Sequence, residues 1–83
     1  MYSKGKYLVV KIGHLDRAIV FEEGVSHDEI GILFRSPPTS GGFFHYTDKG
    51  VVVYGESTSC MVKSLPTDAV LIGRAISHPA ALV

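Results

Sequence analysis

The sequence has no tryptophan, a single cysteine and no excess of charge of either sign. The lone Cys60 excludes an internal disulfide and is typical of a reducing compartment. Eight basic and eight acidic residues give a formal net charge of zero, so the chain shows no electrostatic attraction for a phosphate backbone. We therefore expect no nucleic-acid partner.

Long hydrophobic runs are also missing. Residues 1–6 lead into only about seven apolar-rich positions, which is too few for the core of a signal peptide or for a membrane span. The sequence therefore predicts a cytoplasmic protein without a membrane partner.

Apolar residues are nevertheless abundant for so short a chain. They make up 46% of the 83 residues, which are expected to form a single domain, residues 1–83. A domain of this size buries only about 60 to 65% of its unfolded surface, so its core is small. This apolar content exceeds what two short helices can cover.

Local patterns predict an α+β fold with the element order β-β-α-β-β-β-α. Apolar runs at residues 7–12 and 18–21 predict a first hairpin, and residues 43–54 predict a second. Residues 59–63 resume an extended pattern and predict a third strand there. The sheet is expected to be small and mainly antiparallel, with both helices on one face, because that is the most economical arrangement.

The first helix has a strong start signal. Ser26 stands where an N-cap is expected, and Glu29, three residues later, is the acidic partner of a capping box. The helix is predicted to end by Arg35. Its buried stripe is expected to consist of Ile30, Leu33 and Phe34.

The second helix is predicted to begin at Ser64, with Pro66 in its first turn. Asp68 would then lie near the positive end of the helix dipole. Because Pro79 follows His78, the helix is expected to close at His78.

The central hairpin can be predicted in more detail. A three-residue loop, Asp48-Lys49-Gly50, is typical of a type I turn followed by a glycine bulge, and it sets Thr47 opposite Val51. One face would carry Phe44, Tyr46, Val52 and Tyr54, and the other Phe43, His45, Val51 and Val53. Since both faces are apolar, the uncovered face is expected to mediate assembly of a homodimer or tetramer.

A set of short segments carries a resemblance: Ile19-Val20-Phe21, Ser26-His27-Asp28-Glu29-Ile30, Ser40-Gly41-Gly42-Phe43, Val53-Tyr54-Gly55-Glu56-Ser57-Thr58-Ser59 and Ser64-Leu65-Pro66-Thr67-Asp68-Ala69-Val70-Leu71-Ile72. This pattern resembles a group of small uncharacterised bacterial proteins that also occur in mobile elements such as integron gene cassettes. Pro37-Pro38 and Gly41 depart from the group's pattern and make the loop before Gly42 looser. The resemblance implies no activity, because the group has none assigned.

Residues 55–59 form the polar segment most suited to chemistry. They approach the nucleophile-elbow motif, but Ser59 stands where that motif needs glycine, and an extended segment follows where it needs a helix. No catalytic serine is therefore expected, and a hydroxyl-rich turn that satisfies its own backbone donors explains the pattern. The segment nevertheless provides candidate ligand contacts, which are Tyr54, Glu56, Ser57 and Ser59.

The four histidines do not form a metal-binding pattern, because no two of them are spaced as ligands on one element. Asp28 and Glu29, beside His27, are explained as carboxylates at a helix start. His45 lies in the middle of an apolar strand, either as a satisfied core or interface histidine or as a further candidate ligand contact. We therefore expect no metal, no cofactor and no catalytic residue.

Two functions from different classes fit the sequence. The preferred one is a non-enzymatic, homo-oligomeric interaction module that binds a protein or small-molecule partner. The alternative is a small ligand-binding protein or enzyme whose pocket forms between subunits and uses Tyr54, Glu56 and His45. Convergence of Glu56 and His45 in one pocket would favour the alternative. The predicted alternation, however, sets His45 on the opposite face from Tyr54 and Glu56.

Overall fold

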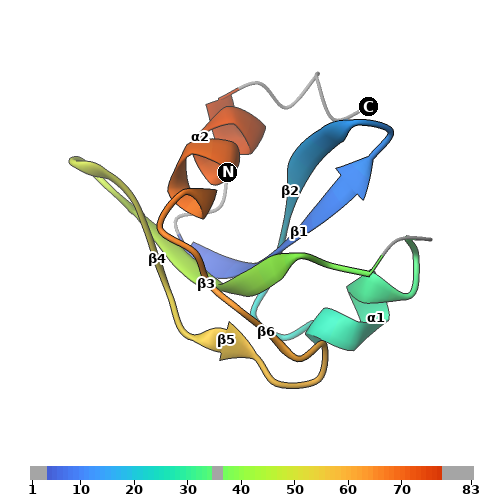
Figure 1. The fold of residues 1–83 in the computed structure, drawn as a ribbon. Coiled ribbons are helices and arrows are strands. Elements are labelled where there is room, and N and C mark those ends of the chain that lie inside the picture. Colours follow the sequence, from blue (N-terminus) through green and yellow to red (C-terminus); the bar gives the residue numbers. More distant parts are fainter. Residues whose placement is uncertain (1–3, 35–36, 78–83) are drawn as a thin grey trace.

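In the computed structural model, which describes residues 4–34 and 37–77, the chain forms an antiparallel sheet, a small hairpin and two helices (Figure 1). The predicted α+β class with an antiparallel sheet is confirmed. The main sheet has the strand order β2-β1-β3-β4 and consists of β1 (Lys4–Ile12), β2 (Leu15–Phe21), β3 (Ser40–Thr47) and β4 (Gly50–Tyr54). The small hairpin consists of β5 (Glu56–Ser57) and β6 (Val62–Lys63).

Helix α2 (Asp68–Ser77) covers one face of the sheet (Figure 1). Its Ile72 and Ala75 are buried in the main core cluster, together with Tyr7, Val9, Ala18 and Phe44. The predicted closing residue of this helix, His78, lies outside the described residues.

Helix α1 (His27–Gly31) lies on the opposite face. Phe21 and Phe43 are both register partners of Lys6, so they share a face, and this face is opposite to that of Phe44 because side chains alternate along a strand. The ring of His27 contacts both phenylalanine rings. The prediction that both helices share one face is therefore wrong. The sheet is apolar on both sides, and each face needs its own cover.

Helix α1 is shorter than predicted and ends at Gly31. Beyond it the chain makes bonds of the i→i+3 type, from Leu33 N to Ile30 O and from Phe34 N to Gly31 O, which tighten the last turn. Leu33 is 72% exposed, so its predicted place in a buried stripe is wrong. The helix thus ends before Arg35, within the predicted limit, but it does not include the predicted stripe residues Leu33 and Phe34.

The start of α1 is partly as predicted. Ser26 occupies the N-cap position with an extended backbone, but its side chain makes no cap hydrogen bond. The position is therefore confirmed, and the hydrogen bond that defines a capping box is not formed there.

The central hairpin has a register one residue away from the predicted one. Thr47 pairs with Gly50 instead of Val51, so the loop is Asp48-Lys49 alone. The Thr47 hydroxyl donates to the Gly50 carbonyl over 3.0 Å and accepts from the Lys49 amide over 3.1 Å, which closes this shorter loop. Because side chains alternate, the shift exchanges the faces of all β4 residues. Phe44 and Tyr46 share a face with Val51 and Val53, and Phe43 and His45 share one with Val52 and Tyr54.

Where the sequence predicted one further strand, the structure has a two-stranded hairpin. Val62–Lys63 is extended as expected, but residues 58–61 form a turn, and Glu56–Ser57 is an additional strand that the sequence did not predict. Gly55 has a φ of +73°, which lets the chain bend sharply out of β4. The hairpin packs against β3, where a Cβ added at Gly41 would lie 3.2 Å from Val62 Cγ2. The absence of a side chain at Gly41 thus lets the small hairpin lie close to β3, over Leu8.

Candidate functional site

The predicted contact residues His45 and Tyr54 lie together, contrary to the predicted alternation. Their ring centroids are 5.5 Å apart with a tilt of 50°. Tyr54 also stacks on Phe43 at 5.8 Å, and it is 46% exposed. The register shift in the central hairpin is the cause, since it turns Tyr54 to the face of His45. The two rings form an aromatic pair, with Tyr54 exposed on the edge strand β4 and His45 half-buried on the neighbouring strand β3.

This pair is one end of a continuous row of ring contacts, which we call the aromatic row. Each ring contacts the next through edge-on, stacked or tilted geometry with centroids 5.4 to 5.8 Å apart. The row begins on β2, passes through α1, β3 and β4, and ends on β3, in the order Phe21, His27, Phe43, Tyr54 and His45. Aromatic pairs at such distances add stability beyond the area that they bury.

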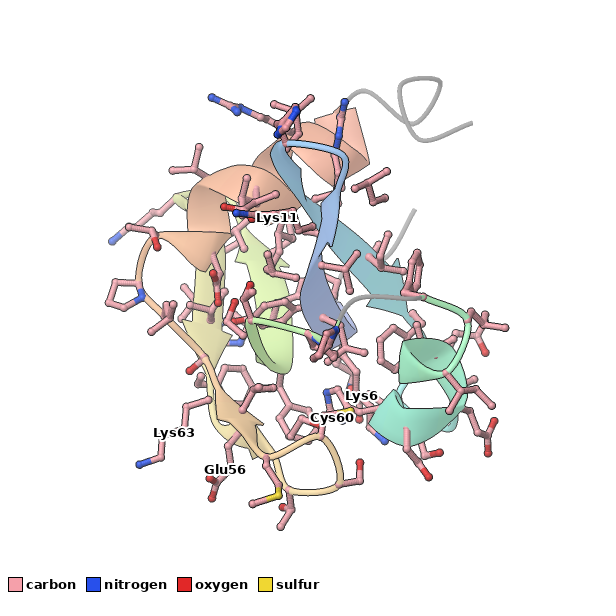
Figure 2. All side chains as sticks on the ribbon, turned by 45° about the vertical axis from the view of Figure 1, so that its right-hand side comes forward. Lys6, Lys11, Glu56, Cys60 and Lys63 are labelled. Atoms are coloured by element: carbon pink, nitrogen blue, oxygen red, sulfur yellow. The ribbon has the colours of Figure 1, made fainter. Side chains whose placement is uncertain are left out.

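Glu56 lies apart from this pair. It is the register partner of Lys63 across the small hairpin, and both side chains point outward (Figure 2). Among the residues that the structure describes, no hydrogen bond or ion pair links Glu56 to His45. The convergence that would favour a pocket with Glu56 and His45 is therefore not observed within one chain.

The two serines of the polar segment differ in exposure. Ser57 is 1% exposed, and its hydroxyl accepts a hydrogen bond from the Cys60 amide over 3.4 Å. Ser59 lies exposed in the turn between β5 and β6. For Ser57 this is the geometry of a turn that satisfies its own backbone donors.

A buried polar cluster at the start of α2 was not predicted. Asp68 is 2% exposed and accepts three hydrogen bonds, from the Tyr7 hydroxyl over 2.6 Å, the Ser40 hydroxyl over 2.9 Å and the Leu65 amide over 2.9 Å. Burial, and then the hydrogen bond to Asp68 and its charge, raise the pKa of Tyr7 far above its usual value. The sequence signal was present, because Asp68 follows Pro66 at a helix start. Its partners in β1 and β3, however, lie far away along the chain.

The buried carboxylate joins β1, β3 and the start of α2. Each of its oxygens accepts at least one hydrogen bond from within the chain. We interpret the cluster as a structural connection between α2 and the central strands.

His27 is the second buried polar residue that sequence reasoning missed. It is 5% exposed, and its Nε2 lies 2.9 Å from the Gly42 carbonyl oxygen, to which it donates. Burial lowers the pKa of His27, and the nearby positive charge of Lys6 acts in the same direction. The pKa of the neighbouring Asp28 is also lowered, mainly by a hydrogen bond from Ser26. The pattern His27-Asp28-Glu29 indicated only a helix start.

Within residues 4–34 and 37–77, no three histidine, cysteine, aspartate or glutamate side chains gather as a metal-binding group. No helix in the same part of the chain is both long and apolar enough to span a membrane. Comparisons of the sequence with protein-family models and curated proteins, and of the fold with solved structures, find no match.

Proposed function

We propose that this protein is a non-enzymatic interaction module that self-associates through the outer edge of strand β4. The observation that carries the proposal is the composition of this edge. β4 is the last strand in the order β2-β1-β3-β4, and its five residues, Gly50–Tyr54, include no charge and no proline. An unprotected edge of this kind presents backbone donors and acceptors that pair readily with another strand.

The opposite edge of the sheet provides a contrast. β2 carries Asp16 and Arg17, and charged residues on an edge strand disfavour pairing with a second chain. On β4, Val52 is 44% exposed and Tyr54 is 46% exposed. The sheet therefore has one protected edge and one edge suited to association.

A second copy of the chain is the occupant that this edge fits best. Two identical strands can pair antiparallel about a two-fold axis, which places the same surface on both sides of the contact. Paired about Val52, the two strands would bring four half-exposed apolar side chains together, because each copy contributes Val52 and Tyr54. The strands are short, and the contact would be smaller than the roughly 1,200 to 2,000 Å² of a stable interface. The association is therefore expected to depend on concentration.

Edge pairing replaces the face-to-face association expected from the sequence. Val53 packs against the core cluster beside α2, and α1 and the small hairpin cover much of the opposite face. A substitution at Val53 would therefore damage the core of the monomer. Val52, on the uncovered part of the sheet, is the better probe.

Two further expectations stay part of this proposal. Cys60 is a free cysteine, which supports a reducing, cytoplasmic location. The resemblance to small bacterial proteins of integron cassettes rests on the sequence motifs and implies no activity. Of the two functions considered, the interaction module is preferred, because no hydrogen bond or ion pair joins Glu56 to His45 among the described residues.

The test is Val52→Lys, which adds a charge to the β4 edge. We expect the unmodified protein to show a mass above 9.0 kDa by light scattering at high micromolar concentration, and the variant to stay monomeric. Lysine on an edge strand is a common natural barrier to strand pairing.

Val70→Lys is the matched control, because Val70 is 60% exposed on α2, away from the edge. It should leave the association unchanged. A monomer at every concentration up to the solubility limit would refute the proposal, and so would equal loss of association in the two variants.

A further inference from the structure

Helix α1 contributes one buried side chain to the face of the sheet that it covers, that of His27, and its backbone at Gly31 packs near Leu8 and Cys60. Within the helix His27–Gly31, His27 is the buried residue, whereas Asp28 and Glu29 are exposed and Ile30 is half-buried. The residues that follow, Ile32 and Leu33, are 81% and 72% exposed and add little packing. The position of the helix therefore depends strongly on the state of one titratable ring.

On balance, the surroundings of this ring favour its neutral form. The His27 ring lies between two phenyl rings, with centroids 5.4 Å from Phe21 and 5.7 Å from Phe43, both in edge-on geometry. Its Nε2 donates to the Gly42 carbonyl over 2.9 Å. The neighbours from β2 and β3, which are Phe21, Phe43 and Gly42, provide no negative charge.

The charged groups near the ring come from β1 and from α1 itself. Lys6 of β1 donates its ammonium to the Val25 carbonyl over 3.0 Å, just before the helix, and its charge opposes a second cation. Asp28 would favour the charged ring, but its carboxylate is exposed to solvent, which screens it. Burial outweighs the contributions of the Gly42 carbonyl, of Asp28 and of the Tyr7 backbone, which all favour the charged ring, so the pKa of His27 lies below its usual value.

We propose that His27 is a pH-sensitive latch, whose protonation releases helix α1 from the sheet and uncovers Phe21 and Phe43 while the core beneath α2 stays folded. The two faces of the sheet can respond separately, because the main core cluster is formed by other residues, including Phe44 and Ile72, on the opposite face. In the released state Phe21 and Phe43 would be uncovered next to the aromatic pair of Tyr54 and His45. This latch is independent of self-association at the β4 edge.

The experiment is an NMR titration of the isotope-labelled full chain from pH 7.5 to 4.5, at a concentration where it is monomeric. The His27 ring resonances report its protonation, and cross-relaxation between His27 and the rings of Phe21 and Phe43 reports the closed latch. We expect these contacts to vanish as the His27 ring titrates. Cross-relaxation between Phe44 and Ile72 should persist over the same range.

Two glutamine variants separate His27 from the other histidines. His27→Gln keeps a donor for the Gly42 carbonyl but cannot titrate, so the Phe21 and Phe43 resonances should no longer respond to pH. His45→Gln is the control and should keep the full response.

Three results would overturn the proposal. They are survival of the His27 contacts after the ring is protonated, simultaneous loss of the Phe44 to Ile72 contact, and a ring that stays neutral to pH 4.5. The titration of the unmodified chain decides among these outcomes even if His27→Gln does not fold.

Discussion

At the scale of single residues, the most consequential group is the carboxylate of Asp68. It accepts hydrogen bonds from a side chain of β1, a side chain of β3 and a backbone amide just before α2. A buried charge is tolerated only when such partners surround it. Loss of the carboxylate should therefore leave at least one of these buried donors without an acceptor.

Asp68→Asn tests this role with almost no change in volume. The amide group can accept at one end only, so at least one donor loses its partner, and we expect a loss of about 2 to 4 kcal/mol in the free energy of unfolding. Urea denaturation followed by circular dichroism measures this loss.

Asp48→Asn is the matched control, because Asp48 is exposed in the loop of the central hairpin. Its effect should stay within about 0.5 kcal/mol. An equally small effect of Asp68→Asn would show that the hydrogen bonds to Asp68 do not support the fold.

At the scale of elements, local sequence signals and tertiary contacts disagree most clearly in helix α1. The N-cap position of Ser26 follows from local preference, yet the hydroxyl does not bond the backbone of the first turn. The helix instead depends on the tertiary contacts of His27. A short helix has little stability of its own, so such contacts decide where it ends.

Ser26→Ala separates the two sources of stability. Removing a side chain that caps a helix lowers the free energy of unfolding by roughly 0.5 to 2 kcal/mol. Because the Ser26 hydroxyl makes no cap hydrogen bond, we expect a loss below about 0.5 kcal/mol. Denaturant unfolding of the variant and the unmodified chain gives the difference. A loss above about 1 kcal/mol would mean that the hydroxyl caps the helix in solution.

At the scale of the whole molecule, the cluster of Asp68 makes stability depend on alkaline pH. Burial and the hydrogen bond to Asp68 raise the pKa of Tyr7 in the folded state well above its usual value of 10.0. A group whose folded pKa is raised stabilises the fold fully below its unfolded pKa, and it loses that contribution as the pH rises further. The fold should therefore weaken above pH 10.

Tyr7→Phe measures this dependence. The variant should be less stable at pH 7 by about 1 to 3 kcal/mol, because the Asp68 carboxylate loses a donor. Above pH 10 the difference from the unmodified chain should shrink by about 1.4 kcal/mol per pH unit, the linkage of one proton. The comparison uses chemical denaturation at several pH values.

Tyr54→Phe is the matched control, because it removes the same hydroxyl group from a tyrosine that is 46% exposed. A constant difference between Tyr7→Phe and the unmodified chain from pH 9 to 11 would contradict the raised pKa of Tyr7.

The sequence by itself determined the class of fold and most of its elements. β-branched runs, turn residues and helix-start residues act over a few positions, so strands such as β1 and the helix α2 could be predicted from them. The candidate contacts Tyr54 and His45 could also be chosen from the sequence, but not their proximity.

Tertiary structure alone decided the register, the covered faces and the buried polar groups. The Thr47 hydroxyl closes a loop one residue shorter than the predicted one, and this single step moved Tyr54 to the face of His45. The side-chain partners of Asp68 lie 61 and 28 residues away along the chain, and the partner of His27 lies 15 residues away, so no local pattern contains them. Such contacts form only when strands and helices pack. A polar group that is buried by this packing must form its hydrogen bonds with the groups that the fold places beside it.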